Sequence, residues 1–189
     1  MSVYTNIHDV PAGYDIIYMD PPWKQTRGGK KQVRPNSSGI SVPYKTMNLS
    51  DIEEYIKVVT DKSKNANVFL WVIQKYYIEA NQIMKRLGFK KHTDIVWDKG
   101  NGPCPAFTVR MSHEYLQWWY KPGKIIKPVD PGKYTTVLKE NHTTHSTKPE
   151  AAYRMIEVMF PNTNRIELFA RNTRNQWDSF GNEIKKRLL

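Results

Sequence analysis

The chain has little cysteine and no long hydrophobic run. Cys104 is the single cysteine among 189 residues, so an internal disulfide and a multi-cysteine zinc site are both excluded. Low cysteine usage is typical of reducing, intracellular compartments. No apolar stretch is long enough to span a membrane, and the first residues, MSVYTNIHDV, do not read as a secretory signal. We therefore expect a cytoplasmic protein with no membrane partner.

Glycine-rich nucleotide motifs are also missing. Neither the P-loop pattern G-x-x-x-x-G-K-[ST] nor the dinucleotide pattern G-x-G-x-x-G occurs, and the H-x-E and C-x-x-C pair of zinc deaminases is absent. His142 and His145 could ligate a metal, but ordinary loop histidines are the simpler interpretation. We expect no metal site.

Positive charge is what the chain has in excess. Its 29 lysines and arginines outnumber 18 acidic residues, and the net charge of +11 favours a polyanionic partner, although a merely soluble basic surface would look the same. Residues 24–34 hold no acid, and 121–139 hold only Asp130. We expect flexible, substrate-facing loops over 24–42 and 121–147. The basic residues expected to hold nucleic-acid phosphates are Lys24, Arg27, Lys30, Lys31 and Arg34.

Strand and helix patterns alternate along the chain. Nearly continuous apolar runs predict buried strands, and apolar residues at i, i+3, i+4 and i+7 predict amphipathic helices. Ser50 and Glu53 predict a capping box. The order favours one α/β domain over 1–189, with a doubly wound, mostly parallel sheet and helices on both faces. The predicted strands cover 14–19, 67–73, 89–99, 112–120 and 165–171, and the predicted helices cover 48–63, 75–88 and 148–160.

The stretch YDIIYMDPPW, residues 14–23, ends a predicted strand in an acid and two prolines. Pro21 and Pro22 fix their own φ angles and restrict the residue before each, so the loop is stiff. Asp20 stands at the carboxyl end of the strand, where open α/β sheets bind their ligands. A capped strand end followed by a rigid turn is the purely structural alternative.

DPPW at 20–23 resembles the signature of the adenine N6-methyltransferases that include the catalytic subunit of the eukaryotic mRNA N6-adenosine methyltransferase and small phage and bacterial DNA relatives. Further blocks resemble this family in the family's order, from about Tyr14 to Glu183, whereas residues 1–13 match none. The resemblance implies a Rossmann-like, S-adenosyl-L-methionine-dependent methyltransferase fold, with the catalytic loop early and the cofactor strand late. The further blocks are YKTMNLSDIEEY, FLWV, GFKKHTDIVWDK, SHEYL, STKPE and RIELFARNTRNQWDSFGNE.

For the target base, the resemblance implies that Asp20 and the Pro21 carbonyl bind the amine. Two preorganised acceptors on its N–H bonds would turn the nitrogen toward tetrahedral geometry and stabilise the charge that develops during attack. Pro22 and Trp23 would shape the adenine slot; for Trp23 a place in the core is an equal alternative. Two more family positions beside the base correspond to Tyr44 and Glu114.

For the cofactor S-adenosyl-L-methionine, the resemblance implies that Asp20 lies beside it and that Lys148 reaches toward its methionine end. Residues of the last block would bind its ribose, carboxylate and adenine. The family often has histidine and asparagine where this chain has Thr173 and Arg174. The residues implied for the ribose and carboxylate are Glu167, Arg171, Thr173 and Arg174, and those implied for the adenine are Asn182 and Glu183.

These observations predict a methyltransferase acting on the N6 amine of adenine in nucleic acid. DNA is preferred over RNA because the compact domain carries no accessory module. An RNA enzyme and a non-catalytic nucleic-acid-binding subunit that stimulates a partner enzyme are the alternatives. A cytosine-N4 enzyme fits less well, since Asp rather than Ser leads the tetrapeptide. Family members often pair, so a homodimer or a related partner subunit is also expected.

Overall fold

A computed structural model describes residues 1–24, 46–100, 109, 111–141, 147–181 and 184. Its centre is an eight-stranded sheet in the order β1-β8-β7-β2-β3-β5-β4-β6. Every neighbouring pair is parallel except β3–β5 and β5–β4. The expected mostly parallel α/β sheet is confirmed. The strands are β1 Val3–Tyr4, β2 Ile16–Met19, β3 Asn67–Val72, β4 Lys90–Asp98, β5 His113–Tyr120, β6 Val137–Lys139, β7 Arg165–Leu168 and β8 Asp178–Phe180.

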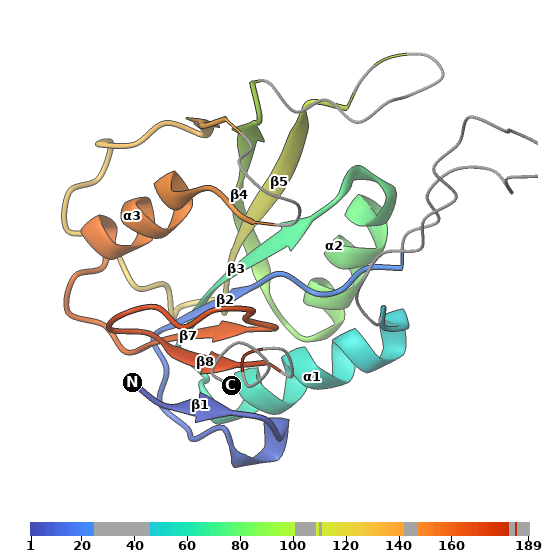
Figure 1. The fold of residues 1–189 in the computed structure, drawn as a ribbon. Helices are drawn as coiled ribbons and strands as arrows, with labels where there is room; N and C mark the ends of the chain where they lie inside the picture. Colours follow the sequence, from blue (N-terminus) through green and yellow to red (C-terminus); the bar gives the residue numbers. More distant parts are fainter. Residues whose placement is uncertain (25–45, 101–108, 110, 142–146, 182–183, 185–189) are drawn as a thin grey trace, which may run out of the picture.

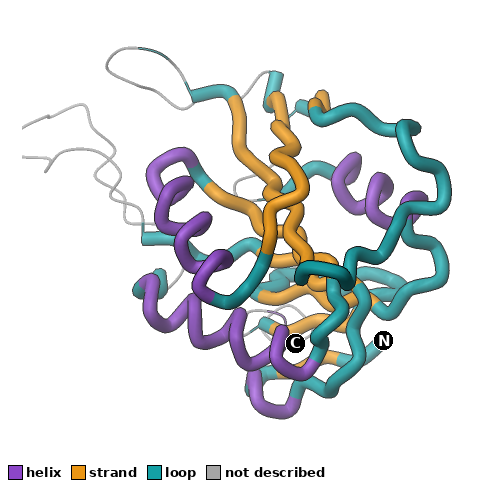
Figure 2. Tube along the Cα trace, turned by 180° about the vertical axis from the view of Figure 1, so that it is seen from behind, coloured by secondary structure: helices purple, strands orange, loops and turns teal. Residues whose placement is uncertain are grey.

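Helices cover both faces of this sheet, as expected (Figures 1 and 2). Helices α1 (Leu49–Lys62) and α2 (Tyr77–Arg86) pack on one face and α3 (Glu150–Met159) on the other. Short 3-10 turns, η1 (Ile7–Asp9) and η2 (Gln74–Tyr76), complete the helical elements described. No helix within the described ranges is long and apolar enough to cross a membrane.

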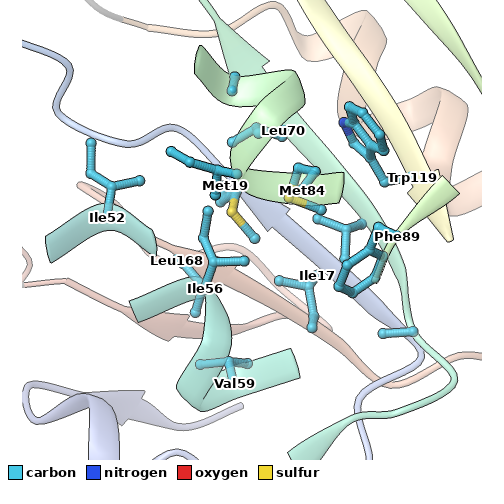
Figure 3. Close-up of a cluster of buried hydrophobic side chains, with 14 of the residues drawn as sticks. Ile17, Met19, Ile52, Ile56, Val59, Leu70, Met84, Phe89, Trp119 and Leu168 are labelled. Atoms are coloured by element: carbon cyan, nitrogen blue, oxygen red, sulfur yellow. The ribbon is translucent and has the colours of Figure 1, made fainter. Parts of the chain in front are cut away.

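The central strands are buried on both sides, which explains their nearly continuous apolar sequences. Successive side chains alternate between two cores, so Ile17 and Met19 face α1 and α2, whereas Tyr18 faces α3 (Figure 3). Each fully buried aliphatic side chain contributes roughly 1.5–3 kcal/mol. The helix stripes meet these cores as the periodicity predicts, through Ile52, Ile56 and Val59 of α1, Ala80 and Met84 of α2, and Ala152, Met155 and Ile156 of α3.

The prediction of a capping box at the start of α1 is wrong. The N-cap is Asn48, without a side-chain cap bond, and the Ser50 hydroxyl instead donates to the Asp51 carboxylate at 3.3 Å. Glu53 accepts two bonds from Arg86 of α2, at 2.6 and 2.9 Å. A bidentate ion pair between two helices therefore takes the carboxylate that the local motif would have used.

The segment 121–147 begins at the amino end of the sheet. The Asn67 carboxamide, at the start of β3, exchanges two hydrogen bonds with the Ile126 backbone, and the Val129 N–H donates to the Met159 carbonyl. The chain then forms β6, which runs parallel to β4 and ends at the carboxyl edge. Because only this last part reaches the edge that holds the site, we restrict the prediction of a substrate-facing loop to residues after Val137.

One edge of the sheet gathers the expected functional residues. Strands β2, β3, β4 and β7 point the same way, so Asp20, after β2, and Phe169, after β7, leave the sheet at one edge. Strand β5 runs the opposite way and therefore begins there, which places Glu114 opposite Trp97 of β4. The β4–β5 pairing is irregular only between Lys91 and Thr93, near the other end.

Candidate active site

Backbone hydrogen bonds hold the loop after β2. The Trp23 N–H donates to the Pro21 carbonyl at 2.7 Å, which closes a three-residue turn, and the Met47 N–H donates to the Pro22 carbonyl at 3.0 Å. A carbonyl oxygen has two lone pairs, so the Pro21 oxygen keeps one acceptor site. Asp20 stands at the start of this stiff turn with its side chain 20% exposed.

Trp23 is a core residue. Its side chain is 2% exposed, its indole N–H donates to the Trp71 carbonyl at 2.9 Å, and its ring stacks on Tyr76 at 5.4 Å. The Tyr76 hydroxyl in turn donates to the Lys24 carbonyl at 2.6 Å. Of the two interpretations given to Trp23, the structure shows the core position, from which it fixes the course of the loop.

Four charged side chains form a chain of contacts at the carboxyl edge. The Lys148 ammonium lies 3.1 Å from Asp20 Oδ1 and 2.7 Å from Glu114 Oε2. The Lys99 ammonium lies 2.6 Å from the other Glu114 oxygen. All four side chains are between 10% and 20% exposed. The structure thus brings together Asp20, Glu114 and Lys148, which come from different parts of the sequence.

Burial and charge set the protonation states of this group. Burial raises the pKa of Asp20, and the neighbouring Lys148 only partly offsets this effect. Burial would also raise the pKa of Glu114, but Lys148 and Lys99 together outweigh it and bring that pKa to about 2. Burial disfavours the Lys148 ammonium, yet the two carboxylates raise its pKa above the usual value. At neutral pH Glu114 and Lys148 are therefore both ionised.

Two tryptophans form the floor beneath the lysines. Lys148 lies 5.1 Å from the Trp71 ring centre and Lys99 lies 5.2 Å from that of Trp97. The two rings meet edge to face at 5.9 Å and belong to the core beneath α3. Cations over desolvated aromatic faces are attracted by the ring quadrupole, so the two rings help to hold both ammonium groups in place.

The end of β7 supplies a second acid. Burial raises the pKa of Glu167 to about 7, although the Tyr153 hydroxyl donates to its carboxylate at 3.0 Å and opposes the shift. Glu167 pairs in register with Tyr18 of β2, whose hydroxyl accepts the Trp71 indole N–H at 2.6 Å. Polar groups thus extend from the tryptophans beneath the lysines to the end of β7.

The residues after Glu167 fall into different surroundings. Phe169 has a φ of +63°, a strained conformation for a bulky residue that costs on the order of 1–3 kcal/mol, and it follows Leu168, which pairs with Met19 of β2. Such strain often occurs at binding sites. Arg171 is half-buried and its positive charge lowers the pKa of Asp20, whereas the Thr173 side chain is exposed.

Arg174 is engaged by helix α3. Its guanidinium donates to both oxygens of Glu150 and both oxygens of Glu157, at 2.6–2.9 Å, and lies 4.6 Å from the Tyr153 ring centre. Because these carboxylates occupy both sides of the guanidinium, Arg174 ties the loop after β7 to α3 and orients Tyr153.

Some expected residues lie outside the described part of the chain. They are Arg27, Lys30, Lys31, Arg34, Tyr44, Cys104, His142, His145, Asn182 and Glu183. Among the residues that are described, no group of three or more His, Cys, Asp and Glu side chains could hold a metal ion.

Lys99, Trp71 and Tyr153 also belong to this site, and none of them was predicted from the sequence. Lys99 directly follows β4, just as Asp20 directly follows β2. A single lysine at the end of a strand, however, matches no sequence motif. Trp71 and Tyr153 fit the buried stripes of a strand and a helix, and only their hydrogen bonds separate them from ordinary core residues.

Comparison with known proteins gives a consistent set of relatives. The MT-A70 family model matches residues 14–183. The chain is 30% identical to the type II methyltransferase M.MunI of Mycoplasma sp over 186 residues, covering 90% of this chain and 78% of that protein. It is 25% identical to the human N(6)-adenosine-methyltransferase catalytic subunit METTL3 and 26% identical to a putative MT-A70-like protein of Medicago truncatula. These matches cover 90% and 93% of this chain but only 28% and 27% of those longer proteins.

Proposed function

Because the chain belongs to the MT-A70 family of N6-adenine methyltransferases, we propose that it uses S-adenosyl-L-methionine to methylate the N6 amine of adenine in DNA. The observation that carries the proposal is the Asp20 carboxylate, held by Lys148 at the end of β2 beside the rigid Pro21 carbonyl. DNA is preferred because the chain is 30% identical to the type II methyltransferase M.MunI and 25% identical to human METTL3.

The target amine needs acceptors more than it needs a base. Its lone pair is delocalised into the adenine ring, and positive charge develops on the nitrogen as it attacks. Asp20 and the free lone pair of the Pro21 carbonyl would accept its two N–H bonds and stabilise that charge. Removing one such preorganised group typically costs about 3 kcal/mol, or roughly a hundredfold in rate. The prolines and the Trp23 anchor hold the two acceptors in place before the base arrives.

The residues at this edge fit the cofactor's chemistry. S-adenosyl-L-methionine supplies a methyl group on a sulfonium, together with an amino-acid end and a ribose. Asp20 offers negative charge to the cationic groups, Lys148 and Arg171 offer positive charge to the carboxylate, and the partly buried Glu167 can accept hydrogen bonds from ribose hydroxyls. Arg174 would orient Tyr153 rather than bind the cofactor directly. Asn182 and Glu183 remain proposed adenine ligands.

The substrate must present an unpaired base. An N6 amine inside a duplex is paired, so the adenine has to be single-stranded or flipped out. Exposed Lys24 follows the catalytic turn directly, and the basic residues after it are proposed to hold the strand's phosphates. Tyr44 and Glu114 are proposed neighbours of the base. A homodimer or a related partner subunit is compatible with this arrangement.

Methyl transfer from labelled S-adenosyl-L-methionine to single-stranded DNA, duplex DNA and RNA, followed by mass spectrometry of the nucleosides, tests the proposal. N6-methyladenine in a DNA pool is expected. Product in the RNA pool alone would assign the chain to the RNA enzymes. Asp20→Asn should abolish transfer, whereas Asp61→Asn, on the exposed end of α1, should not. If calorimetry detects cofactor binding but no methyl group is transferred to any of the three pools, the chain is better explained as a non-catalytic subunit. That result would overturn the proposal.

A further inference from the structure

We infer that Lys99 is a positioning residue that holds the catalytic carboxylate in its working state by acting through Glu114 and Lys148. The inference rests on the proposed methyltransferase function. Lys99 does not touch Asp20, so its role follows from the contacts that connect them.

Each contact in this connection is short and partly buried. Lys99 holds Glu114 Oε1 at 2.6 Å, Lys148 holds Glu114 Oε2 at 2.7 Å, and Lys148 reaches Asp20 Oδ1 at 3.1 Å. Both carboxylate oxygens of Glu114 are thus committed, each to a different ammonium. Lys99 therefore fixes the direction of Glu114, and Glu114 in turn fixes the ammonium that contacts Asp20.

The charges of the four groups sum to zero. Without Lys99, two carboxylates would share the single ammonium of Lys148, and like charges in a partly buried site raise each other's pKa. Glu114 would draw Lys148 more strongly, and Asp20 would lose part of the positive charge that keeps it ionised. The titratable or charged groups that act on Asp20 and Glu114, or are affected by them, are Lys148, Lys99, Arg171, Glu167 and Tyr18.

The tryptophan floor places Lys99 independently of Glu114. Its ammonium lies over Trp97, whose indole N–H is anchored on the Glu140 carbonyl at 2.8 Å. The side chain is 10% exposed, so most of its stem is covered by protein. A lysine ordered by both a carboxylate and a ring face loses little further freedom when substrate binds, which suits a positioning role.

The pH profile of kcat/KM tests the inference. Lys99→Met keeps the apolar stem and removes the charge, Lys99→Gln is a second neutral variant in case the first misfolds, and Lys99→Arg keeps the charge. Lys91→Met is the matched control, because Lys91 also pairs with a carboxylate, Asp94 at 2.9 Å, but lies near the start of β4, whereas Lys99 directly follows the end of that strand.

We expect the neutral variants to shift the acid limb of the profile upward by about one pH unit. At pH 7 they should lower kcat/KM by up to about tenfold, the limit that a shift of one pH unit sets. The direction follows because the ionised Asp20 carboxylate is the stronger acceptor for the N–H groups, so a higher pKa removes activity at the acid side first. Lys99→Arg should restore most of the rate, and Lys91→Met should keep the wild-type acid limb.

A titration of the Glu114 carboxyl by carbon-13 NMR provides a readout that needs no turnover. Its pKa should rise from about 2 toward 4.5 in Lys99→Met and stay low in Lys91→Met. An unshifted Glu114 titration, or an acid limb equal to that of the control, overturns the inference. A wild-type chain that transfers no methyl group overturns the proposed function instead, and the titration still decides whether Lys99 controls Glu114.

Discussion

The ammonium of Lys148 lies 3.1 Å from the carboxylate of Asp20, the acid that ends the first central strand. The acceptor proposed for the target amine is therefore already paired before any substrate is present. Lys148 also forms an ion pair with Glu114, so its ammonium can move closer to one carboxylate while it still contacts the other. This arrangement opposes the effect of burial on the Asp20 pKa, and the contact with Lys148 is made by one carboxylate oxygen, Oδ1.

Lys148→Met should lower kcat/KM at neutral pH by about a hundredfold, because Asp20 loses the charge that opposes the effect of burial on its pKa. Activity should recover partly at higher pH, where Asp20 ionises without help. Steady-state kinetics between pH 5 and pH 9 measures this, with the exposed Lys57→Met as control. Equal losses at every pH would show that Lys148 contributes only contact with the substrates.

Glu167→Gln should stabilise the cofactor-free protein at alkaline pH. The folded pKa of Glu167, about 7, lies above its ordinary value of 4.5, so the protonated form is favoured by folding. This contribution is present below pH 4.5 and is lost as pH rises through 7. Glutamine cannot ionise and still accepts from Tyr153, so the variant should gain about 1–3 kcal/mol at pH 8. Denaturant unfolding at pH 5 and pH 8 checks it; an equal effect at both would contradict the assignment.

Glu140→Gln should weaken the start of α3. The Glu140 carboxylate accepts the N–H groups of Glu150 and Ala151, both at 2.8 Å, and so caps a helix from a distant segment. Losing the negative charge at a helix N-terminus costs about 1 kcal/mol. A drop of about 2–4 °C in Tm is expected by calorimetry for a chain of this size. Glu54→Gln, exposed on α1, should leave Tm unchanged.

Arg174→Ala and Arg171→Ala should distinguish an effect on protein stability from an effect on cofactor binding. Arg174 is paired with Glu150 and Glu157, so its loss should lower stability, with a smaller effect on cofactor affinity. The charge of Arg171 acts on Asp20, so its loss should mainly reduce affinity for S-adenosyl-L-methionine. Unfolding and isothermal calorimetry on both variants give the comparison. The reverse pattern would return Arg174 to the role of cofactor ligand implied by the family resemblance.

Alternation along the strands relates several residues of the site, although Glu114 and Lys148 were predicted from the family resemblance alone. Tyr18 and Asp20 share a face because they are two residues apart, and the same rule relates Leu116 to Glu114. The long apolar strands and the helix stripes were predictable for the same reason. Asp20 was recognisable because it follows a buried strand and precedes two prolines that stiffen the chain.

Long-range pairing explains what could not be predicted. Strands β1 and β8 have two and three residues, too few for a periodic pattern, and form by pairing with each other and with β7. Glu53 joined Arg86 of another helix instead of its own cap. Lys99 acquired a role only because a neighbouring strand brought Glu114 within 2.6 Å of it.

The reversed direction of β5 has a consequence for how this site tolerates length changes. Glu114 reaches Lys99 only in the register that sets it opposite Trp97, and a slip of one residue would turn it to the opposite face of the sheet. The irregularity between Lys91 and Thr93 lies where β4 begins, away from the site. An insertion absorbed there would leave the ion network intact, whereas a single extra residue between Trp97 and Lys99 would disconnect it. Insertions should therefore be tolerated at one end of the β4–β5 pair and not at the end that holds the site.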